Sequence, residues 1–149
     1  MLSALLIGVI AGLRAMTPPA AVSWLARSGW LNLGGTAFAF LGYAWTPWIF
    51  TALAIGEIIN DKLPTTPSRT VPIQFGGRIL MGGLCGAAIG ASRGSMVGGL
   101  VAGVVGSVIG TLGGRAVRAR LAASFGSDRP AALIEDTIAI VGAVMILLH

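Results

Sequence analysis

The sequence predicts an all-α fold, a polytopic bundle of membrane helices made from about five hydrophobic segments within one domain, residues 1–149. Two observations predict it. The chain is 55% hydrophobic and only 10% charged, whereas soluble domains carry about 25% charged residues. Small residues also recur at every fourth position, which would destabilise a soluble helix but lets membrane helices approach closely. This row consists of Gly82, Gly86, Gly90, Gly94, Gly98, Ala102, Gly106, Gly110 and Gly114.

The first hydrophobic segment, residues 2–26, is interrupted at Pro18-Pro19. Proline removes a backbone donor and pushes the preceding residue out of the helical region. We therefore expect two half-helices, 2–15 and 19–27, joined near the middle of the membrane. Irregular backbone at that depth is tolerated only where it is buried in protein or lines a wet cavity.

The second segment, residues 36–60, contains Pro47, where we expect a kink. Residues 61–72 follow as the one long polar stretch, rich in proline and hydroxyl groups, and are typical of an ordered loop.

The third and fourth segments, residues 76–91 and 95–113, are separated by only three residues and predict a Gly-rich helical hairpin in the centre of the chain. The third is short, so it either spans the membrane or re-enters it. The fifth segment, residues 130–148, has a clear start, with Ser127 or Asp128 as its N-cap.

The basic residues predict the orientation of the bundle. Cytoplasmic loops of membrane proteins carry an excess of Lys and Arg. Loops one and three carry Arg27 and Arg93. Loops two and four with their flanks carry Lys62, Arg69, Arg78, Arg115, Arg118, Arg120 and Arg129. We therefore expect loops two and four, and the N-terminus, to lie in the cytoplasm and the chain to be a multi-pass protein of the plasma membrane.

The sequence contains none of the motifs that identify common soluble enzymes, so we expect no enzymatic activity. One histidine, His149, and one cysteine, Cys85, cannot form a zinc site, and no metal or other cofactor is expected. The net charge of +5 does not predict nucleic-acid binding, because the arginines are scattered and no polar domain presents a basic face.

Ionisable residues within the hydrophobic segments, or at their ends, are the candidate site. A charge inside the membrane costs at least about 2.5–3.5 kcal/mol, so such residues usually face the bundle interior and pair. The candidates for a cavity that binds an ion or solute are Arg14, Thr17, Glu57, Asn60, Asp61, Arg78, Arg115, Glu135 and Asp136. In the polar loop, Lys62, Ser68 and Arg69 either bind an anion or a phospholipid headgroup or belong to a stiff connector.

The fourth segment carries a ridge of small residues that is typical of close helix packing. The ridge consists of Gly98, Ala102, Gly106 and Gly110. A bundle this small exposes much Gly-rich surface, so we expect membrane lipids as neighbours and a homo-oligomer, most simply a dimer, packed through segments three and four.

Three motifs of the chain resemble those of the domain-of-unknown-function 4126 family of small bacterial membrane proteins. They are Gly12-Leu13-Arg14-Ala15-Met16-Thr17-Pro18-Pro19-Ala20; Glu57-x-x-Asn60-Asp61-Lys62-Leu63-Pro64 with Pro67-Ser68-Arg69-Thr70; and Ala132-Leu133-Ile134-Glu135-Asp136. The resemblance covers nearly the whole chain and implies an integral membrane protein of bacteria, with no activity attached. The motif residues coincide with the polar residues chosen above.

Two functions are compatible with these residues. In the first, the chain is a small transporter or channel whose charged cavity takes an ion, a proton or a small polar solute. In this hypothesis the N-terminus of the second half-helix, at Pro18-Pro19, offers free N–H groups to an anion. In the second, the chain is a non-transporting scaffold or assembly protein, and the same charges are salt bridges that fix the helix register.

Overall fold

The computed structural model describes residues 1–63 and 71–149, and within these ranges the regular secondary structure is all helical. The helices run in the order α1 (Leu2–Leu13), α2 (Thr17–Arg27), the 3₁₀ helix η1 (Ala39–Gly42), α3 (Thr46–Asn60), α4 (Pro72–Ser92), α5 (Met96–Phe125) and α6 (Asp128–Leu148). Two of them, α5 and α6, are long and apolar enough to cross a membrane by length and composition.

The break in the first hydrophobic segment is confirmed. Helix α1 ends at Leu13, and α2 begins at Thr17 with its two prolines in the first turn. Proline suits the first turn because the N–H it lacks would have no partner inside the helix. The second half-helix therefore starts two residues earlier than the predicted residue 19.

The predicted kink at Pro47 is wrong. Pro47 stands in the first turn of α3, which begins at Thr46, and no helix precedes it directly. The chain arrives there through η1, and the Thr46 hydroxyl donates a hydrogen bond to the carbonyl of Phe40 at 2.7 Å. The same local rule that places the prolines of α2 thus applies to Pro47, which starts a helix instead of bending one.

The later helices follow the predicted segments, with longer bounds. Helix α4 adds residues at both ends of the third segment, and α5 continues twelve residues beyond the predicted end at residue 113, to Phe125. It ends at Gly126, whose φ of +67° is the left-handed conformation that closes many helices. The predicted N-cap of α6 is confirmed, since the Ser127 side chain accepts a hydrogen bond from the backbone N–H of Arg129.

A seam of glycines holds α1, α4 and α5 together, and we call these backbone contacts the glycine seam. A Cβ atom added at Gly103 would lie 2.1 Å from the carbonyl oxygen of Gly82 on α4. One added at Gly106 would lie 2.1 Å from the carbonyl oxygen of Leu5 on α1. Because no side chain fits at these contacts, the backbones of three helices touch directly. Seam positions are Gly8, Gly12, Gly82, Gly86, Gly90, Gly99, Gly103, Gly106 and Gly110.

The seam corrects the predicted ridge of small residues. Gly106 and Gly110 pack against α1 within the same chain, and α4 is contacted by Gly99 and Gly103. A Cβ at Gly98 would meet only side chains, those of Ser95 and Met1. Ala102 is only partly buried. The surface on which a dimer was expected is thus largely used inside one copy.

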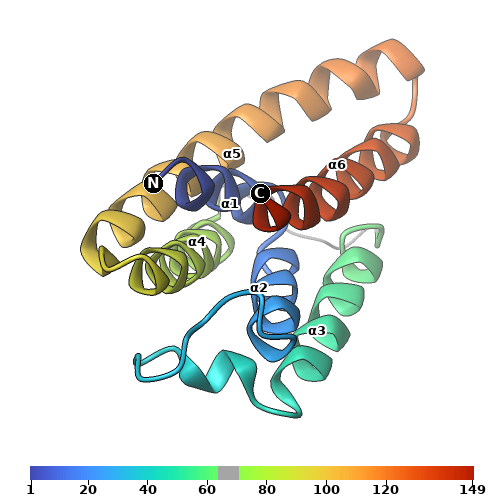
Figure 1. The fold of residues 1–149 in the computed structure, drawn as a ribbon. Helices are drawn as coiled ribbons and strands as arrows, with labels where there is room; N and C mark the ends of the chain where they lie inside the picture. The colour runs from blue at the N-terminus through green and yellow to red at the C-terminus, as the bar shows by residue number, and fades with distance from the viewer. Residues whose placement is uncertain (64–70) are drawn as a thin grey trace.

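The helices form two groups that meet at the break after α1. Helices α1, α4, α5 and α6 pack together, while α2 packs on α3 and η1 (Figure 1). The C-terminal end of α3 lies beside the break, because Glu57 of α3 binds the backbone N–H groups of Ala15 and Met16. This arrangement brings the end of α1, the start of α2 and the end of α3 together around residues 12–16.

Candidate ion-pair site

All five Asp and Glu side chains of the chain lie in one region, and among the described residues they form ion pairs with four basic side chains. The region has two parts. We call Glu57 and Arg78, with the backbone groups they bind, the helix-break clamp. We call the remaining seven side chains the outer cluster, which consists of Arg14, Asp61, Lys62, Arg118, Asp128, Glu135 and Asp136.

The helix-break clamp satisfies the backbone on both sides of the break. Arg78 of α4 donates hydrogen bonds to the carbonyls of Gly12 and Leu13, at 2.7 and 2.6 Å. Glu57 of α3 accepts hydrogen bonds from the N–H groups of Ala15 and Met16, both at 2.9 Å. A cation thus lies at the C-terminus of α1 and an anion at the N-terminus of α2, as the helix dipoles favour.

The two clamp side chains also face each other. Arg78 Nη2 lies 3.8 Å from Glu57 Oε1, and the Thr111 hydroxyl is a second donor to the Gly12 carbonyl, at 3.3 Å. The anion site that we predicted at the start of the second half-helix is therefore occupied by Glu57 of the chain itself. Thr17, a predicted site residue, is buried and lines an apolar groove between α2, α3 and α6.

The outer cluster is built around two arginines. Arg14 donates from Nη2 to Asp61 of the α3 end, at 3.1 Å, and to Asp136 of α6. Arg118 of α5 donates from Nη1 to Asp61 at 2.8 Å and to Glu135 at 3.3 Å. Asp61 thus bridges the two arginines, and the cluster connects α1, α3, α5 and α6.

Two further groups complete the cluster. Lys62 Nζ lies 2.8 Å from Asp136, the carboxylate that also binds Arg14. Asp128 receives a hydrogen bond from Arg118 Nε at 2.9 Å. In the part of the chain that the structure describes, the Nε and Nη1 atoms of Arg14 are buried and have no hydrogen-bond partner. An unpaired buried donor costs about 1–3 kcal/mol.

Exposure falls steadily through the outer cluster. The side chain of Asp128 is 59% exposed, those of Lys62 and Asp61 are 35% and 12% exposed, and that of Arg14 is 1% exposed. At the exposed end lies a pocket of about 260 Å³, which we call the vestibule. It is lined by Asp61, Lys62, Leu63, Arg118, Ser127, Asp128, Arg129 and Ala132. The cluster is therefore open to solvent on one side and dry on the other.

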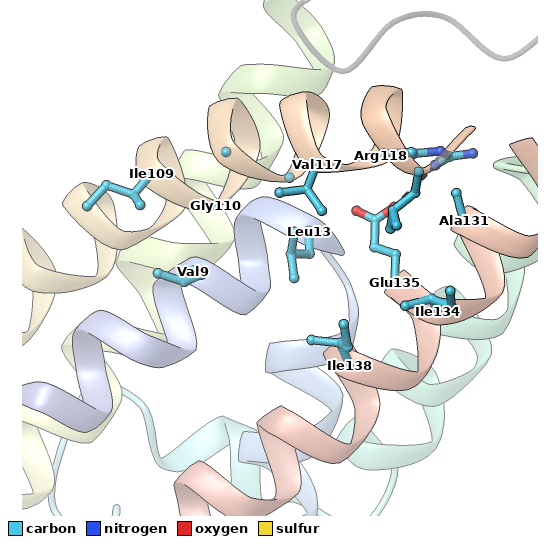
Figure 2. A pocket seen from close by; sticks show the side chains of 13 residues that line it. Val9, Leu13, Ile109, Gly110, Val117, Arg118, Ala131, Ile134, Glu135 and Ile138 are labelled. Atoms are coloured by element: carbon cyan, nitrogen blue, oxygen red, sulfur yellow. Dashed lines mark hydrogen bonds and ion pairs between the residues drawn. The ribbon is translucent and has the colours of Figure 1, made fainter. Parts of the chain in front are cut away.

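A second cavity, of about 280 Å³, adjoins the cluster between α1, α5 and α6. Figure 2 shows its walls, with Leu13 of α1 and Ile138 of α6 facing the space beside α5. Arg118 and Glu135 lie at one end of it. Apart from this ion pair, its lining is apolar side chains and glycine.

Six of the nine predicted cavity residues come together in the ion-pair site, and three, Thr17, Asn60 and Arg115, are not among its ion-paired side chains. Arg115 was predicted to line the cavity but is exposed on α5, and Arg118 of the same helix joins the ion pairs instead. Asn60 is exposed at the last position of α3. Ser68 and Arg69 lie outside the described residues. Lys62, predicted as a loop residue, is a member of the outer cluster, and so is Asp128, predicted only as a possible N-cap.

The chemistry available to the site is that of charge and protons. Among the described residues, the outer cluster holds four carboxylates and three cations. No group of three or more His, Cys, Asp or Glu side chains within those residues is placed to hold a metal ion. The cluster can exchange a proton, and buried Arg14 can bind an acceptor.

Comparison with known proteins identifies one relationship. A family model described as a domain of unknown function, DUF4126, matches residues 1–149, the whole chain. No curated protein and no solved structure matches the chain.

Proposed function

The chain belongs to the DUF4126 family, and from the geometry of its own ionised groups we propose that it is a small membrane transporter or channel for an ion, a proton or a small polar solute. One observation carries the proposal. A polar vestibule leads into a cluster of seven ionisable side chains whose exposure falls from 59% at Asp128 to 1% at Arg14. A purely structural cluster does not need an opening to solvent.

The surface supports a multi-pass membrane location. The outer faces of α5 and α6 carry exposed apolar side chains, such as Val101, Leu112, Leu133 and Val141. Such a surface is unfavourable in water and suits lipid. With these faces in lipid, the bundle spans the bilayer several times, as predicted from the hydrophobic segments.

Aromatic residues and charges occupy opposite ends of α3, which supports the orientation. Exposed Trp45 and Trp48 stand at its beginning, and Asp61 and Lys62 follow its end. Fifteen helical residues span about 22 Å. Tryptophan is enriched at membrane interfaces, and basic residues are enriched on the cytoplasmic side. The ion-pair site is then nearer the cytoplasm of a bacterial plasma membrane. Helix α1 leads from the site to the other end of the bundle, where Arg93 of the α4–α5 connection donates to the Ser3 hydroxyl, so this orientation places the N-terminus on the opposite side from the one predicted.

Two features of the outer cluster favour transport chemistry. Its described residues bring four carboxylates together beside the vestibule, which is an arrangement that can pass protons between neighbouring groups. Its innermost member, Arg14, has two donors without a partner, at the point farthest from the vestibule. A solute or water with an acceptor oxygen would satisfy them.

The second candidate, a non-transporting scaffold, is favoured by the pairing itself. Every described carboxylate has a basic partner, and the helix-break clamp has a purely structural explanation. Buried ion pairs can specify helix register without adding net stability. The two candidates differ over the outer cluster alone.

Neutralising one carboxylate in each part distinguishes these candidates. We expect Glu135→Gln in the outer cluster to lower flux at least tenfold in proteoliposomes, with the bundle still folded. Proton flux under an imposed potential and Na⁺ and chloride flux under imposed gradients are the measurements. Glu57→Gln in the clamp is the matched control, and its main effect should be a loss of stability and not a specific loss of flux.

Two results would contradict transport. One is a folded Glu135→Gln protein whose three fluxes equal those of the unmodified protein. The other is unfolding of Glu135→Gln to the same degree as Glu57→Gln, which is the result that the scaffold predicts.

A further inference from the structure

The cavity between α1, α5 and α6 is lined mainly by apolar side chains and glycine, and we call it the α5–α6 groove (Figure 2). We propose that it holds one acyl chain of an anionic phospholipid, whose phosphate is bound by Arg120 at the groove's edge. The proposal rests on the membrane location proposed above and does not require transport.

Glycine creates the groove, and helix packing does not explain all of the glycines. Gly110 is part of the glycine seam, because a Cβ there would lie 2.1 Å from the carbonyl oxygen of Val9. Gly113 also lines the groove, yet a Cβ there would meet nothing within 4 Å. Glycine in a helix interior is less stable than alanine. Gly113 therefore keeps space open beside α5 that no part of the described chain fills.

The polar groups of the groove are already used. Arg118 binds Asp61, Asp128 and Glu135, so it closes one end of the groove and is not available to a phosphate. An acyl chain matches the remaining lining, which includes Val9, Leu13, Ile109, Val117 and Ile138.

Arg120 is an exposed cation beside the groove. It lies three residues beyond Val117 and directly before Leu121, both of which line the groove, so helical geometry places it at the groove's edge. Arg120 is exposed, and no ion pair involving it is found among the described residues. Basic residues near a membrane surface attract anionic lipids.

Charge also explains why the occupant is a lipid and not a second copy of the chain. All five carboxylates of a copy are engaged in its ion-pair site. A second copy would bring apolar side chains to the groove but no unengaged carboxylate to face Arg120. A phospholipid with a net negative headgroup supplies both parts.

Two pairs of variants test the proposal. Gly113→Leu fills the groove, and Gly56→Leu is its control, because Gly56 of α3 is also helical and also has open space around it. Arg120→Gln removes the cation, and Arg93→Gln, at the α4–α5 connection, is its control. Each protein is placed in nanodiscs that contain equal amounts of phosphatidylglycerol and phosphatidylcholine, and the lipid retained after extraction is counted by native mass spectrometry.

We expect the unmodified protein and both controls to retain phosphatidylglycerol at least fivefold over phosphatidylcholine. Gly113→Leu should lower retention of both lipids about tenfold, and Arg120→Gln should remove the preference while it leaves acyl-chain retention. Equal retention by Gly113→Leu and Gly56→Leu would overturn the proposal.

Two other outcomes are distinguishable. A dimer that Gly113→Leu converts to a monomer, without a change in bound lipid, would assign the groove to a second copy and overturn the lipid proposal. Lipid retention as expected, in a protein whose fluxes are nil, would support the groove and refute only the proposed transport.

Discussion

The glycine seam and the ion-pair site hold the same helices together in opposite ways. In the seam, a single added Cβ at Gly99 or Gly103 would lie 2.1–2.2 Å from a backbone oxygen of α4. In the ion-pair site, long side chains such as Arg14 and Arg118 bridge the helices. Backbone contact leaves no freedom, because neither helix has atoms that can rotate away. Long side chains can exchange partners while the helices stay in place.

The difference suggests a division of labour within the bundle. The seam fixes α1, α4 and α5 as a rigid unit, and the outer cluster is the part whose contacts can change. Gly12 belongs to both regions, since a Cβ there would lie 2.4 Å from the Thr111 nitrogen while its carbonyl accepts from Arg78. Substitutions in the two regions should therefore differ in size, with the helix-break clamp between them.

The largest effect is expected in the seam. Gly103→Ala places a Cβ against the backbone of Gly82, and overpacking usually costs about 1–3 kcal/mol, or more where nothing can move. We expect Gly103→Ala to lose stability by at least the upper end of this range, and thermal unfolding in detergent is the measurement. Gly56→Ala is the control, because a Cβ at Gly56 meets nothing and should raise stability slightly. Equal unfolding temperatures for the two variants would refute the rigid seam.

A smaller but still large loss of stability is expected at the helix-break clamp. Arg78→Met removes the cation from a buried pair and leaves the carbonyls of Gly12 and Leu13 without their Arg78 donor. Breaking such a pair costs about 3–5 kcal/mol. Because part of α2 and α3 can relax, we expect the loss of stability in Arg78→Met to lie at the lower end of this range.

Arg78→Lys and a double variant make this prediction sharper. Lys keeps the charge but lacks the planar fork that reaches two carbonyls, so it should restore only part of the stability. The double variant Arg78→Met with Glu57→Gln should lose less stability than the sum of the losses in the two single variants. Full additivity in chemical unfolding experiments would show that the clamp does not act as a unit.

Local signals in the sequence were sufficient for the break and for the start of α6. Pro18 and Pro19 restrict the backbone wherever they occur, and Ser127 caps a helix through its immediate neighbours. The glycine register was not predictable in the same way. Both Gly98 and Gly99 belong to rows of small residues, and only the partner helix determines which row is buried.

The members of the ion-pair site show the same limit. The fourth segment was predicted to end at residue 113, which made Arg115 the candidate at its end, whereas α5 continues and carries Arg118 into the cluster. A signal existed, since Ser107, Thr111 and Arg118 fall on one helical face. The pairing of Arg14 with Asp136, which are 122 positions apart, depends on helix packing that the sequence alone does not specify.

The smallest effect is expected at the exposed end of the outer cluster. Lys62→Gln removes one cation from Asp136, which keeps its bond to buried Arg14. Lys62 is 35% exposed, so its pair with Asp136 is reached by solvent on the lysine side, and an ion pair open to solvent contributes at most about 1 kcal/mol and is screened by salt. We expect a small loss of stability at low salt that disappears at high salt, measured by thermal unfolding in detergent. A salt-independent loss as large as that of Arg78→Met would show that the outer cluster is as rigid as the glycine seam, and the contrast between the two regions would be lost.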